Sequence, residues 1–118
     1  MEERQAAAAD AVQLARHHEH LVVEDREVTV VRKLAEGGFS EVFLARDRHD
    51  AARVFALKRV LAQTSEQKKG CLFEIALHRR VEHPNVLPVV AACLVAAPRG
   101  RGGANAQEAL LLFPLHAR

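Results

Sequence analysis

A lysine set in an apolar run is the first residue of this sequence whose surroundings suggest chemistry. Lys58 follows VFAL, and an alternating pattern places it on the same face of a strand as Val54 and Ala56. Burying an unpaired ammonium group costs several kcal/mol, so an inward lysine needs a partner or a ligand of opposite charge. The alternative is a lysine on an edge strand whose long side chain reaches back to solvent.

A glutamate farther along the chain could supply that partner. In the segment SEQKKGCLFEIALHRRV, helical spacing puts five residues near one face: Cys71, Glu74, Leu77, His78 and Val81. Taken alone, Glu74 is more typical of a solvated charge on a helix. Together with Lys58 it predicts an ion pair between an inward carboxylate and an inward ammonium group on neighbouring elements.

Two adjacent glycines precede the lysine along the chain. Gly37 and Gly38 lie between two segments with strand periodicity. Such a pair is typical of a tight hairpin turn. Glycines between paired strands also let backbone N–H groups approach phosphate oxygens without obstruction by side chains. Both interpretations of the glycine pair remain open from these residues alone.

Hydrophobic periodicity predicts an α+β fold with five strands. Alternating or continuous apolar patterns mark these strands at 27–35, 39–47, 51–62, 86–97 and 108–114. In the first strand, Val28, Val30 and Leu34 are expected on one face. Pro88 indicates that the fourth is an edge strand, because proline lacks the N–H that a central strand donates. The segment PRGRGGANAQ before the fifth strand has the composition of a flexible loop.

One helix is predicted over about 65–82, packed against the resulting five-stranded antiparallel sheet. Either Thr64 or Ser65 could cap its N-terminus, because both side chains accept a hydrogen bond from a backbone N–H of the first turn. The helical pattern stops before Pro84, which cannot continue a helix.

Composition sets limits on location and partners. A leader at 1–20, helical or disordered, precedes the domain at 21–118, and its clustered histidines are expected to be solvated. The net charge is +2 with acids and bases interspersed, which argues against a nucleic-acid surface. No apolar run approaches the roughly 18–20 residues that cross a bilayer. Cys71 and Cys93 form no CxxC pair. We therefore expect a cytoplasmic protein with free thiols, no membrane insertion and no bound metal.

Three runs taken together resemble a known family. KLAEGGFSEVFLARD, VFALKRV and FEIALHRRVEHPNVLPVVAACL are similar to the N-terminal lobe of eukaryotic serine/threonine protein kinases, over about residues 28–118. Within these kinases the runs are most similar to the Numb-associated group, whose loops often read GEGGFS, with serine in place of the third glycine. The resemblance implies a protein-kinase N-lobe whose glycine loop and lysine bind ATP.

The resemblance defines a glycine-rich loop position by position. The loop corresponds to Ala35, Glu36, Gly37, Gly38, Phe39, Ser40 and Val42. Gly37 matches the second glycine of the family's motif and Ser40 the third. Ala35 departs from the motif, because it stands where the first glycine is expected. The departure narrows the backbone freedom of the loop, although alanine adds only a methyl group.

The resemblance also implies where the adenine ring lies. The residues that enclose the ring, or that begin the hinge beside it, correspond to Leu34, Val42, Ala56, Phe113, Pro114, Leu115 and His116. Phe113 is the gatekeeper among them. The assignment of Leu34, Val42 and Ala56 to the walls around adenine fits the shared-face periodicity of their predicted strands.

Lys58 and Glu74 take the catalytic roles in this resemblance. Lys58 matches the lysine that contacts the α- and β-phosphates of ATP, and Glu74 matches the helix residue that holds this lysine. The family's catalytic loop (HRD…N) and its metal-binding DFG motif do not occur in the 118 residues. The Mg²⁺ ligands expected for a complete kinase are therefore missing. We expect weak ATP binding and no phosphoryl transfer from this chain alone.

Two functions remain open on these grounds. The first is a serine/threonine protein kinase that acts on protein substrates, with this chain as its ATP-binding lobe, truncated at the hinge before the C-terminal lobe. The second is a non-catalytic kinase-like lobe that binds and regulates another protein. A third interpretation is an α+β interaction domain whose motifs match by chance.

Overall fold

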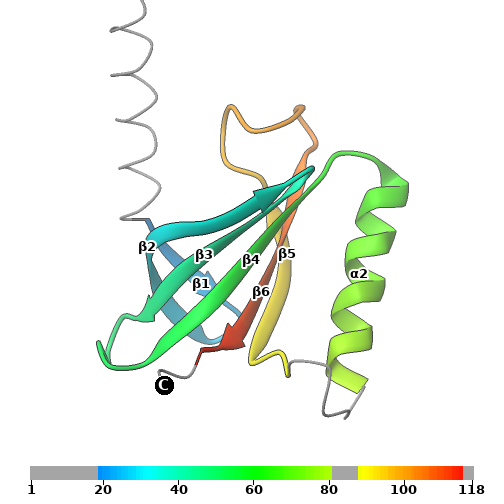
Figure 1. The fold of residues 1–118 in the computed structure, drawn as a ribbon. Coiled ribbons are helices and arrows are strands. Elements are labelled where there is room, and N and C mark those ends of the chain that lie inside the picture. Colours follow the sequence, from blue (N-terminus) through cyan, green and yellow to red (C-terminus); the bar gives the residue numbers. More distant parts are fainter. Residues whose placement is uncertain (1–18, 81–87, 116–118) are drawn as a thin grey trace, which may run out of the picture.

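Within the residues that the structure describes, the chain folds as one antiparallel β-sheet with one helix packed against it (Figure 1). The computed structural model describes residues 19–80 and 88–115. Its elements are β1 (His20–Val23), β2 (Arg26–Gly37), β3 (Ser40–Asp47), β4 (Val54–Ala62), α2 (Ser65–Arg80), β5 (Ala91–Ala96) and β6 (Gln107–Pro114). The strand order in the sheet is β1-β2-β3-β4-β6-β5. The predicted α+β class is confirmed.

Strand β1 makes the sheet six-stranded, whereas five strands were predicted. It is only 4 residues long, which is too short for a periodic pattern to stand out. A turn at Glu24, whose φ is 58°, pairs β1 with the start of β2, and Val23 is completely buried. The fold therefore begins inside the segment predicted as a leader. Residues 1–18, which make up most of the predicted leader, lie outside the described residues.

Two β-bulges in β2 change its predicted faces. The register with β3 shifts after Val30 and again after Lys33. Each shift inserts one extra residue into β2, which breaks the strict alternation of sides. Val28 and Val30 are completely buried, but Leu34 is 42% exposed. The prediction that these three residues share one face is therefore wrong for Leu34.

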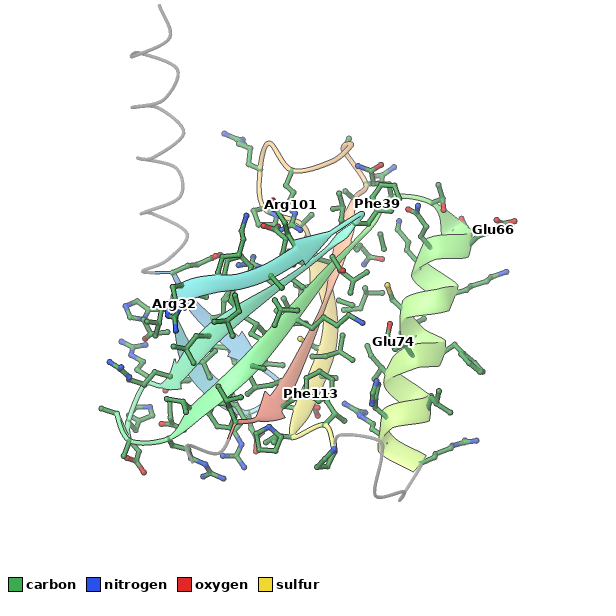
Figure 2. All side chains as sticks on the ribbon, in the orientation of Figure 1. Arg32, Phe39, Glu66, Glu74, Arg101 and Phe113 are labelled. Carbon is green, nitrogen blue, oxygen red and sulfur yellow. The ribbon has the colours of Figure 1, made fainter. Side chains whose placement is uncertain are left out.

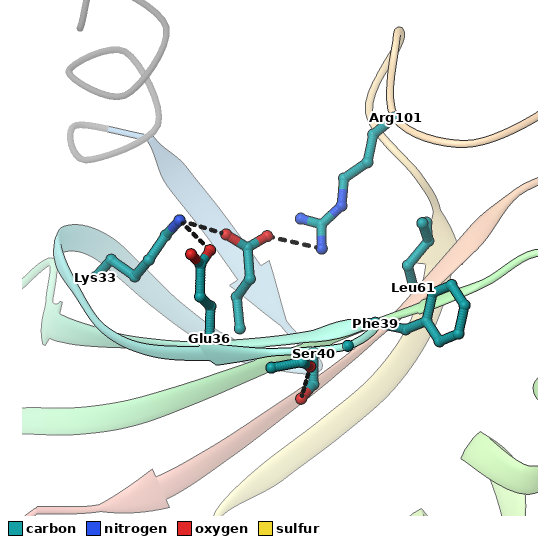
Figure 3. A pocket seen from close by; sticks show the side chains of 9 residues that line it. Lys33, Glu36, Phe39, Ser40, Leu61 and Arg101 are labelled. Carbon is teal, nitrogen blue, oxygen red and sulfur yellow. Dashed lines mark hydrogen bonds and ion pairs between the residues drawn. The ribbon is translucent and has the colours of Figure 1, made fainter. Parts of the chain in front are cut away.

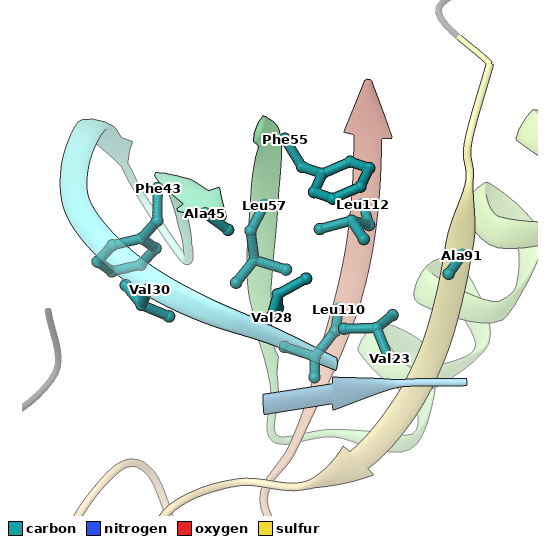
Figure 4. Close-up of a cluster of buried hydrophobic side chains, with 10 residues drawn as sticks. All are labelled: Val23, Val28, Val30, Phe43, Ala45, Phe55, Leu57, Ala91, Leu110 and Leu112. Carbon is teal, nitrogen blue, oxygen red and sulfur yellow. The ribbon is translucent and has the colours of Figure 1, made fainter. Parts of the chain in front are cut away.

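The main hydrophobic core fills one face of the curled sheet, which we call the core face (Figure 4). Its buried side chains are Val23, Val28, Val30, Phe43, Ala45, Phe55, Leu57, Ala91, Leu110 and Leu112. Strand β1 lies across this face and contacts β5 and β6. Strand β6 is central to the burial, because every residue from Glu108 to Phe113 is buried. The burial of this apolar surface is the main force that holds the sheet together.

Helix α2 packs against the opposite face, which we call the helix face. Along β4, Phe55 and Leu57 belong to the core cluster, whereas Ala56 packs with the smaller cluster under α2. The helix contributes only two buried residues to that cluster, Cys71 and Ile75. α2 is therefore attached through far less buried surface than any central strand.

The orientation of α2 differs slightly from the predicted one. Cys71 is buried and Glu74 is half-buried, as predicted, but Leu77 is 46% exposed and Ile75 takes the inward position instead. The helical spacing alone could not distinguish these two choices, because Ile75 and Leu77 both lie within one turn of Glu74. Val81, the last residue of the predicted face, lies outside the described residues.

The N-terminus of α2 is closed by a capping box. The hydroxyl of Thr64 accepts a hydrogen bond from the N–H of Gln67 (3.1 Å), and the side chain of Gln67 accepts one from the N–H of Thr64 (3.2 Å). Thr64 is thus the cap, of the two candidates predicted. Within residues 19–80 and 88–115, no helix is long and apolar enough to cross a membrane.

Strand β5 lies at the edge of the sheet, as predicted. It begins at Ala91, so Pro88 precedes the strand rather than interrupting it. Strand β6 is confirmed at the predicted place and ends at Pro114. Because β6 lies between β4 and β5, the last described strand of the chain is paired on both sides and does not lie at an edge of the sheet.

Candidate functional site

The predicted ion pair between Lys58 and Glu74 is present. The ammonium group of Lys58 donates a hydrogen bond of 2.8 Å to Oε1 of Glu74. Both side chains are about one-third exposed, at 33% and 32%. Figure 2 shows Glu74 on the side of α2 that is turned toward the sheet. The pair is therefore open to water, and a ligand could reach the ammonium group.

Strand register places further predicted site residues on the helix face beside Lys58. Val42 lies opposite Lys58 in the ladder between β3 and β4, and Leu44 lies opposite Ala56. On the other side of β4, Phe113 of β6 lies opposite Ala56. Residues that face each other across a ladder project from the same side of the sheet. Val42, Ala56 and Phe113 thus lie on the same surface as Lys58.

The glycine pair forms a tight hairpin between β2 and β3. Gly37 pairs with Ser40, and Gly38 takes a φ of 53° at the first central position of a two-residue turn. A turn of this kind favours glycine because other residues rarely adopt a positive φ. The hydroxyl of Ser40 donates a hydrogen bond of 3.1 Å to the carbonyl oxygen of Gly37, which closes the turn. Phe39 at the tip is 59% exposed.

Two residues that precede the hairpin, Leu34 and Ala35, differ in how they fit the sheet. Ala35 pairs with Val42 in the β2–β3 ladder. Among the described residues other than glycine, only Glu24 has a positive φ, so the backbone at Ala35 does not require glycine. The alanine that departs from the kinase motif is therefore accommodated without strain. Leu34 lies at a bulge and is exposed, so it is less enclosed than the adenine-contacting position predicted for it.

The predicted gatekeeper and hinge positions lie at the end of β6. Phe113 is buried, with 8% exposure. Pro114 pairs with Phe55, and the N–H of Leu115 donates a hydrogen bond of 3.2 Å to the carbonyl oxygen of Val54. This segment is therefore anchored to β4 at its start. His116 lies outside the described residues.

His78 joins the site although no role was predicted for it. Its Nε2 atom lies 3.9 Å from Oε1 of Glu74, one helical turn earlier. Its ring packs edge-on against Phe113, with ring centroids 5.2 Å apart and an interplanar angle of 73°. His78 thus contacts both the ion-paired glutamate and the predicted gatekeeper. The spacing of four residues from Glu74 was the sequence signal for this contact.

Arg59, the residue after Lys58, points to the opposite side of the sheet. It is 1% exposed and forms two hydrogen bonds with the carboxylate of Glu108, at 2.6 and 3.3 Å. A third hydrogen bond, of 2.7 Å, links it to Glu19. Burial lowers the pKa of the Arg59 guanidinium, but the hydrogen bonds to the two carboxylates outweigh burial and raise the pKa overall. β4 therefore presents a cation on each face.

Cys71 lies beside the ion pair but is a poor nucleophile there. Burial raises the pKa of its thiol, and the negative charge of Glu74 raises it further, while Lys58 lowers it. The thiolate, rather than the thiol, is the reactive form. Both Cys71 and Cys93 are free, as predicted. Neither thiol adds a reactive group to the site.

The arrangement as a whole suits the binding of a phosphorylated ligand. An ammonium group is held in place by a carboxylate, on a surface lined by apolar side chains. The glycine hairpin adjoins this surface through Val42, and it exposes backbone without a side chain at Gly38. Apolar walls with a few fixed polar groups are typical of small-molecule sites.

Known proteins with similar sequences are serine/threonine protein kinases. The chain is 37% identical to serine/threonine-protein kinase 16 of Homo sapiens over 98 residues, which make up 83% of this chain and 30% of the relative. It is 35% identical to the same kinase of Rattus norvegicus over 98 residues, with the same two shares. The chain thus spans about 30% of the length of these curated relatives.

Family models and solved structures tell less about the chain than these sequences do. No protein-family model matches the chain. Among solved structures, the fold is similar to the crystal structure of the BubR1 kinase domain, with a TM-score of 0.49 and 12% sequence identity, over 95% of this chain and 34% of that one.

Proposed function

The chain belongs to the serine/threonine protein kinase family, as a part with the fold of the N-terminal lobe, and on this premise we propose that it binds ATP for phosphoryl transfer to serine and threonine side chains of proteins. The single observation that carries the proposal is the ion pair of Lys58 and Glu74, whose atoms lie 2.8 Å apart. It joins a strand and a helix beside a glycine hairpin, which is the arrangement that kinases use to hold phosphates.

Each residue has a defined task in the proposed site. Lys58 would contact the α- and β-phosphates, and Glu74 would keep its ammonium group in position. The hairpin around Gly38 would cover the phosphates with backbone N–H groups. Val42 and Ala56 would pack against adenine. ATP itself supplies the phosphoryl group that is transferred.

The remaining predicted positions complete the adenine end of the proposed site. Phe113 would limit its depth as the gatekeeper, and Pro114 and Leu115 would begin the hinge that borders the ring. Leu34 would contribute only a peripheral contact, because it is exposed at its bulge.

Magnesium is the part of the chemistry that we do not assign to these residues. Residues 19–80 and 88–115 contain no group of three or more His, Cys, Asp or Glu side chains that could hold a metal ion. The HRD and DFG motifs that supply the acceptor base and the metal ligand in kinases do not occur in the sequence. Transfer therefore requires a C-terminal lobe, which we propose as the partner of this lobe in a complete cytoplasmic kinase.

Nucleotide binding by the 118-residue chain is the direct test. We expect ATP to bind with a dissociation constant of about 1 mM, equivalent to about 4 kcal/mol, because only one wall of the cleft is present. Chemical-shift changes on titration with ATP should centre on Lys58 and Val42. Lys58→Met should remove these changes, whereas Lys69→Met, which removes an exposed helix lysine, should not. Equal responses of the two variants would contradict the proposed site.

Phosphoryl transfer needs a second experiment with a complete kinase domain. The chain is joined to the C-terminal lobe of human serine/threonine-protein kinase 16, and incorporation of radiolabelled phosphate into protein is measured. We expect incorporation by the joined protein, none by the 118-residue chain alone, and none after Lys58→Met. Incorporation by the 118-residue chain that disappears with Lys58→Met would show that half of a site is sufficient.

A regulatory lobe without chemistry is the second candidate function. The exposed side of α2 favours it, because Leu72, Phe73 and Leu77 are 53%, 71% and 46% exposed. Neighbouring exposed apolar residues are typical of surfaces that pack against another protein. If the joined protein binds ATP but transfers no phosphate, the regulatory function is the better explanation.

A further inference from the structure

The loop between β5 and β6 folds into turns beside the glycine hairpin, although its composition predicts a flexible segment. Three backbone hydrogen bonds of 3.0 Å close it, from Ala97 to Ala106, from Arg101 to Pro98 and from Ala106 to Gly103, donor first. Gly102 has a φ of 80°, and a Cβ atom there would lie 2.8 Å from side-chain atoms of both Ala106 and Gln63. The loop is therefore packed closely against the end of β4.

Arg101 extends from this loop to the hairpin. Its Nη2 atom lies 2.9 Å from Oε1 of Glu41, the second residue of β3. Its Nη1 atom lies 3.5 Å from Oε2 of Glu108. The side chains of Arg101 and Glu41 are only 20% and 13% exposed, so this ion pair is weakly screened by water. Figure 3 shows Arg101 reaching down toward the carboxylate beside Glu36.

The contact connects the hairpin to the most deeply buried charges of the fold. On one side, Glu108 is held by the buried guanidinium of Arg59. On the other side, Lys33 lies 2.9 Å from both Glu36 and Glu41, which stand on the two strands of the hairpin. The hydrogen bonds that Lys33 donates to Glu36 and Glu41 raise the pKa of its ammonium group, so it remains charged at neutral pH. Arg101 thus links the sheet interior to the hairpin.

These charges lie on the side of the hairpin that faces away from Lys58. Glu41 pairs with Arg59 in the ladder, and Arg59 projects from the core face. A cavity of about 510 Å³ adjoins the hairpin on this side, lined by Lys33, Glu36, Gly37, Gly38, Phe39, Ser40, Glu41, Leu61 and Arg101. The hairpin consequently has open space behind it, and the contact through Arg101 crosses that space.

We propose that Arg101 is a positioning residue that holds the glycine hairpin over the helix face, and thereby sets the affinity for the nucleotide without touching it. The part of this inference that concerns nucleotide affinity rests on the proposed function, whereas the part that concerns the position of the hairpin does not. Without Arg101, the hairpin could move back into the cavity, and the fraction of molecules ready to bind ATP would fall. The apparent affinity falls in proportion to that fraction.

Two arginines of the same loop provide a matched test in the 118-residue chain. Arg101→Gln removes the ion pairs of Arg101, whereas Arg99→Gln changes an exposed arginine that forms no hydrogen bond or ion pair within residues 19–80 and 88–115. Without nucleotide, Arg101→Gln should speed amide hydrogen exchange at residues 36–42 by about tenfold, while exchange in β6 stays unchanged. ATP binding should weaken by about threefold or more. Arg99→Gln should alter neither quantity.

A conservative variant separates positioning from general destabilisation. Arg101→Lys keeps the positive charge but has one nitrogen in place of the two that lie near Glu41 and Glu108, so both effects should be intermediate. If Arg101→Gln leaves exchange of residues 36–42 at the wild-type rate, the inference is wrong. If exchange rises as expected but the unaltered chain binds no ATP, the positioning of the hairpin stands and the proposed function is overturned.

Discussion

The two faces of the sheet are built in different ways. The core face is closed by ten buried side chains drawn from six strands, and β1 lies across it. The helix face is covered by α2, which supplies only two buried residues, Cys71 and Ile75. Segments with little buried apolar surface open at lower free energy than the core of the same protein. The ion pair proposed to hold ATP therefore joins the well-buried sheet to a helix that is weakly attached.

A substitution in strand β6 should have the largest effect on the free energy of unfolding. Leu112 is completely buried on the core face, so Leu112→Ala should lower the free energy of unfolding by about 2–5 kcal/mol. Leu115→Ala, at a position that is 40% exposed, should lower it by less than about 0.5 kcal/mol. Urea unfolding followed by circular dichroism measures both values. Similar losses in the two variants would contradict the assignment of the core.

The attachment of α2 should respond separately from the core. Ile75→Ala removes one of the two buried anchors of the helix and should cost about 2 kcal/mol, less than Leu112→Ala. Detachment of α2 exposes Cys71 but leaves Cys93 on β5 in place. The rate of thiol labelling at pH 7 should therefore rise at Cys71 alone.

A matched variant controls for changes on the surface of the helix. Leu72→Ala alters a residue of α2 that is 53% exposed, so it should leave the labelling rate of Cys71 unchanged. If both cysteines became reactive together in Ile75→Ala, the helix and the sheet would open as one unit. The expectation that α2 opens at lower free energy than the sheet would then be wrong.

The C-terminal end of α2 is expected to give a smaller effect. Arg79 donates hydrogen bonds to Glu24 (2.6 Å) and to the carbonyl oxygen of Ala92 (2.9 Å), and so ties α2 to the β1–β2 turn and to β5. Arg79→Gln should cost about 0.5–1 kcal/mol, because its side chain is half exposed. Arg80→Gln removes a neighbouring exposed charge and serves as the control. Hydrogen exchange in the last turn of α2 should increase only in Arg79→Gln.

High pH should give the smallest change in the free energy of unfolding. Burial raises the pKa of Cys71 and of Cys93 in the folded chain. As the pH rises past the ordinary thiol range near 9, the unfolded chain loses these protons first, so it binds fewer protons than the folded chain. Stability is therefore complete below that range and declines above it. The measurement is urea unfolding at pH 8 and pH 10, and a Cys71→Ala/Cys93→Ala variant should lose the part of the decline due to thiols.

The ion pair of the candidate site could be predicted because two local periods determine it. Alternation along β4 places Lys58 beside Ala56, and helical spacing places Glu74 beside Cys71. Neither deduction needs knowledge of distant parts of the chain. The same reasoning failed at Leu34, since bulges in β2 reset the alternation and no residue type announces them.

Long-range contacts account for what the sequence did not reveal. Arg59 and Glu108 are 49 residues apart along the chain, and nothing in either local pattern indicates that they pair. Arg101 lies in a segment whose glycines predict flexibility, yet carboxylates from two other strands give the loop a fixed place. The contacts of Arg101 with Glu41 and Glu108 therefore could not be predicted without the order of the strands in the sheet.

The charged side chains of strand β4 disfavour pairing of this strand in a wrong register. Lys58 and Arg59 are neighbours in sequence, but they meet Glu74 on one face and Glu108 on the other. A slip of one residue against β3 or β6 would exchange the faces of both side chains. A slip that moved Lys58 to the place of Leu57 would bring its ammonium group into the apolar interior and leave the buried Glu108 without Arg59, so two uncompensated buried charges would result. Chains misaligned in this way should thus be strongly disfavoured, so the strand that bears the proposed phosphate-binding lysine also helps to enforce its own alignment.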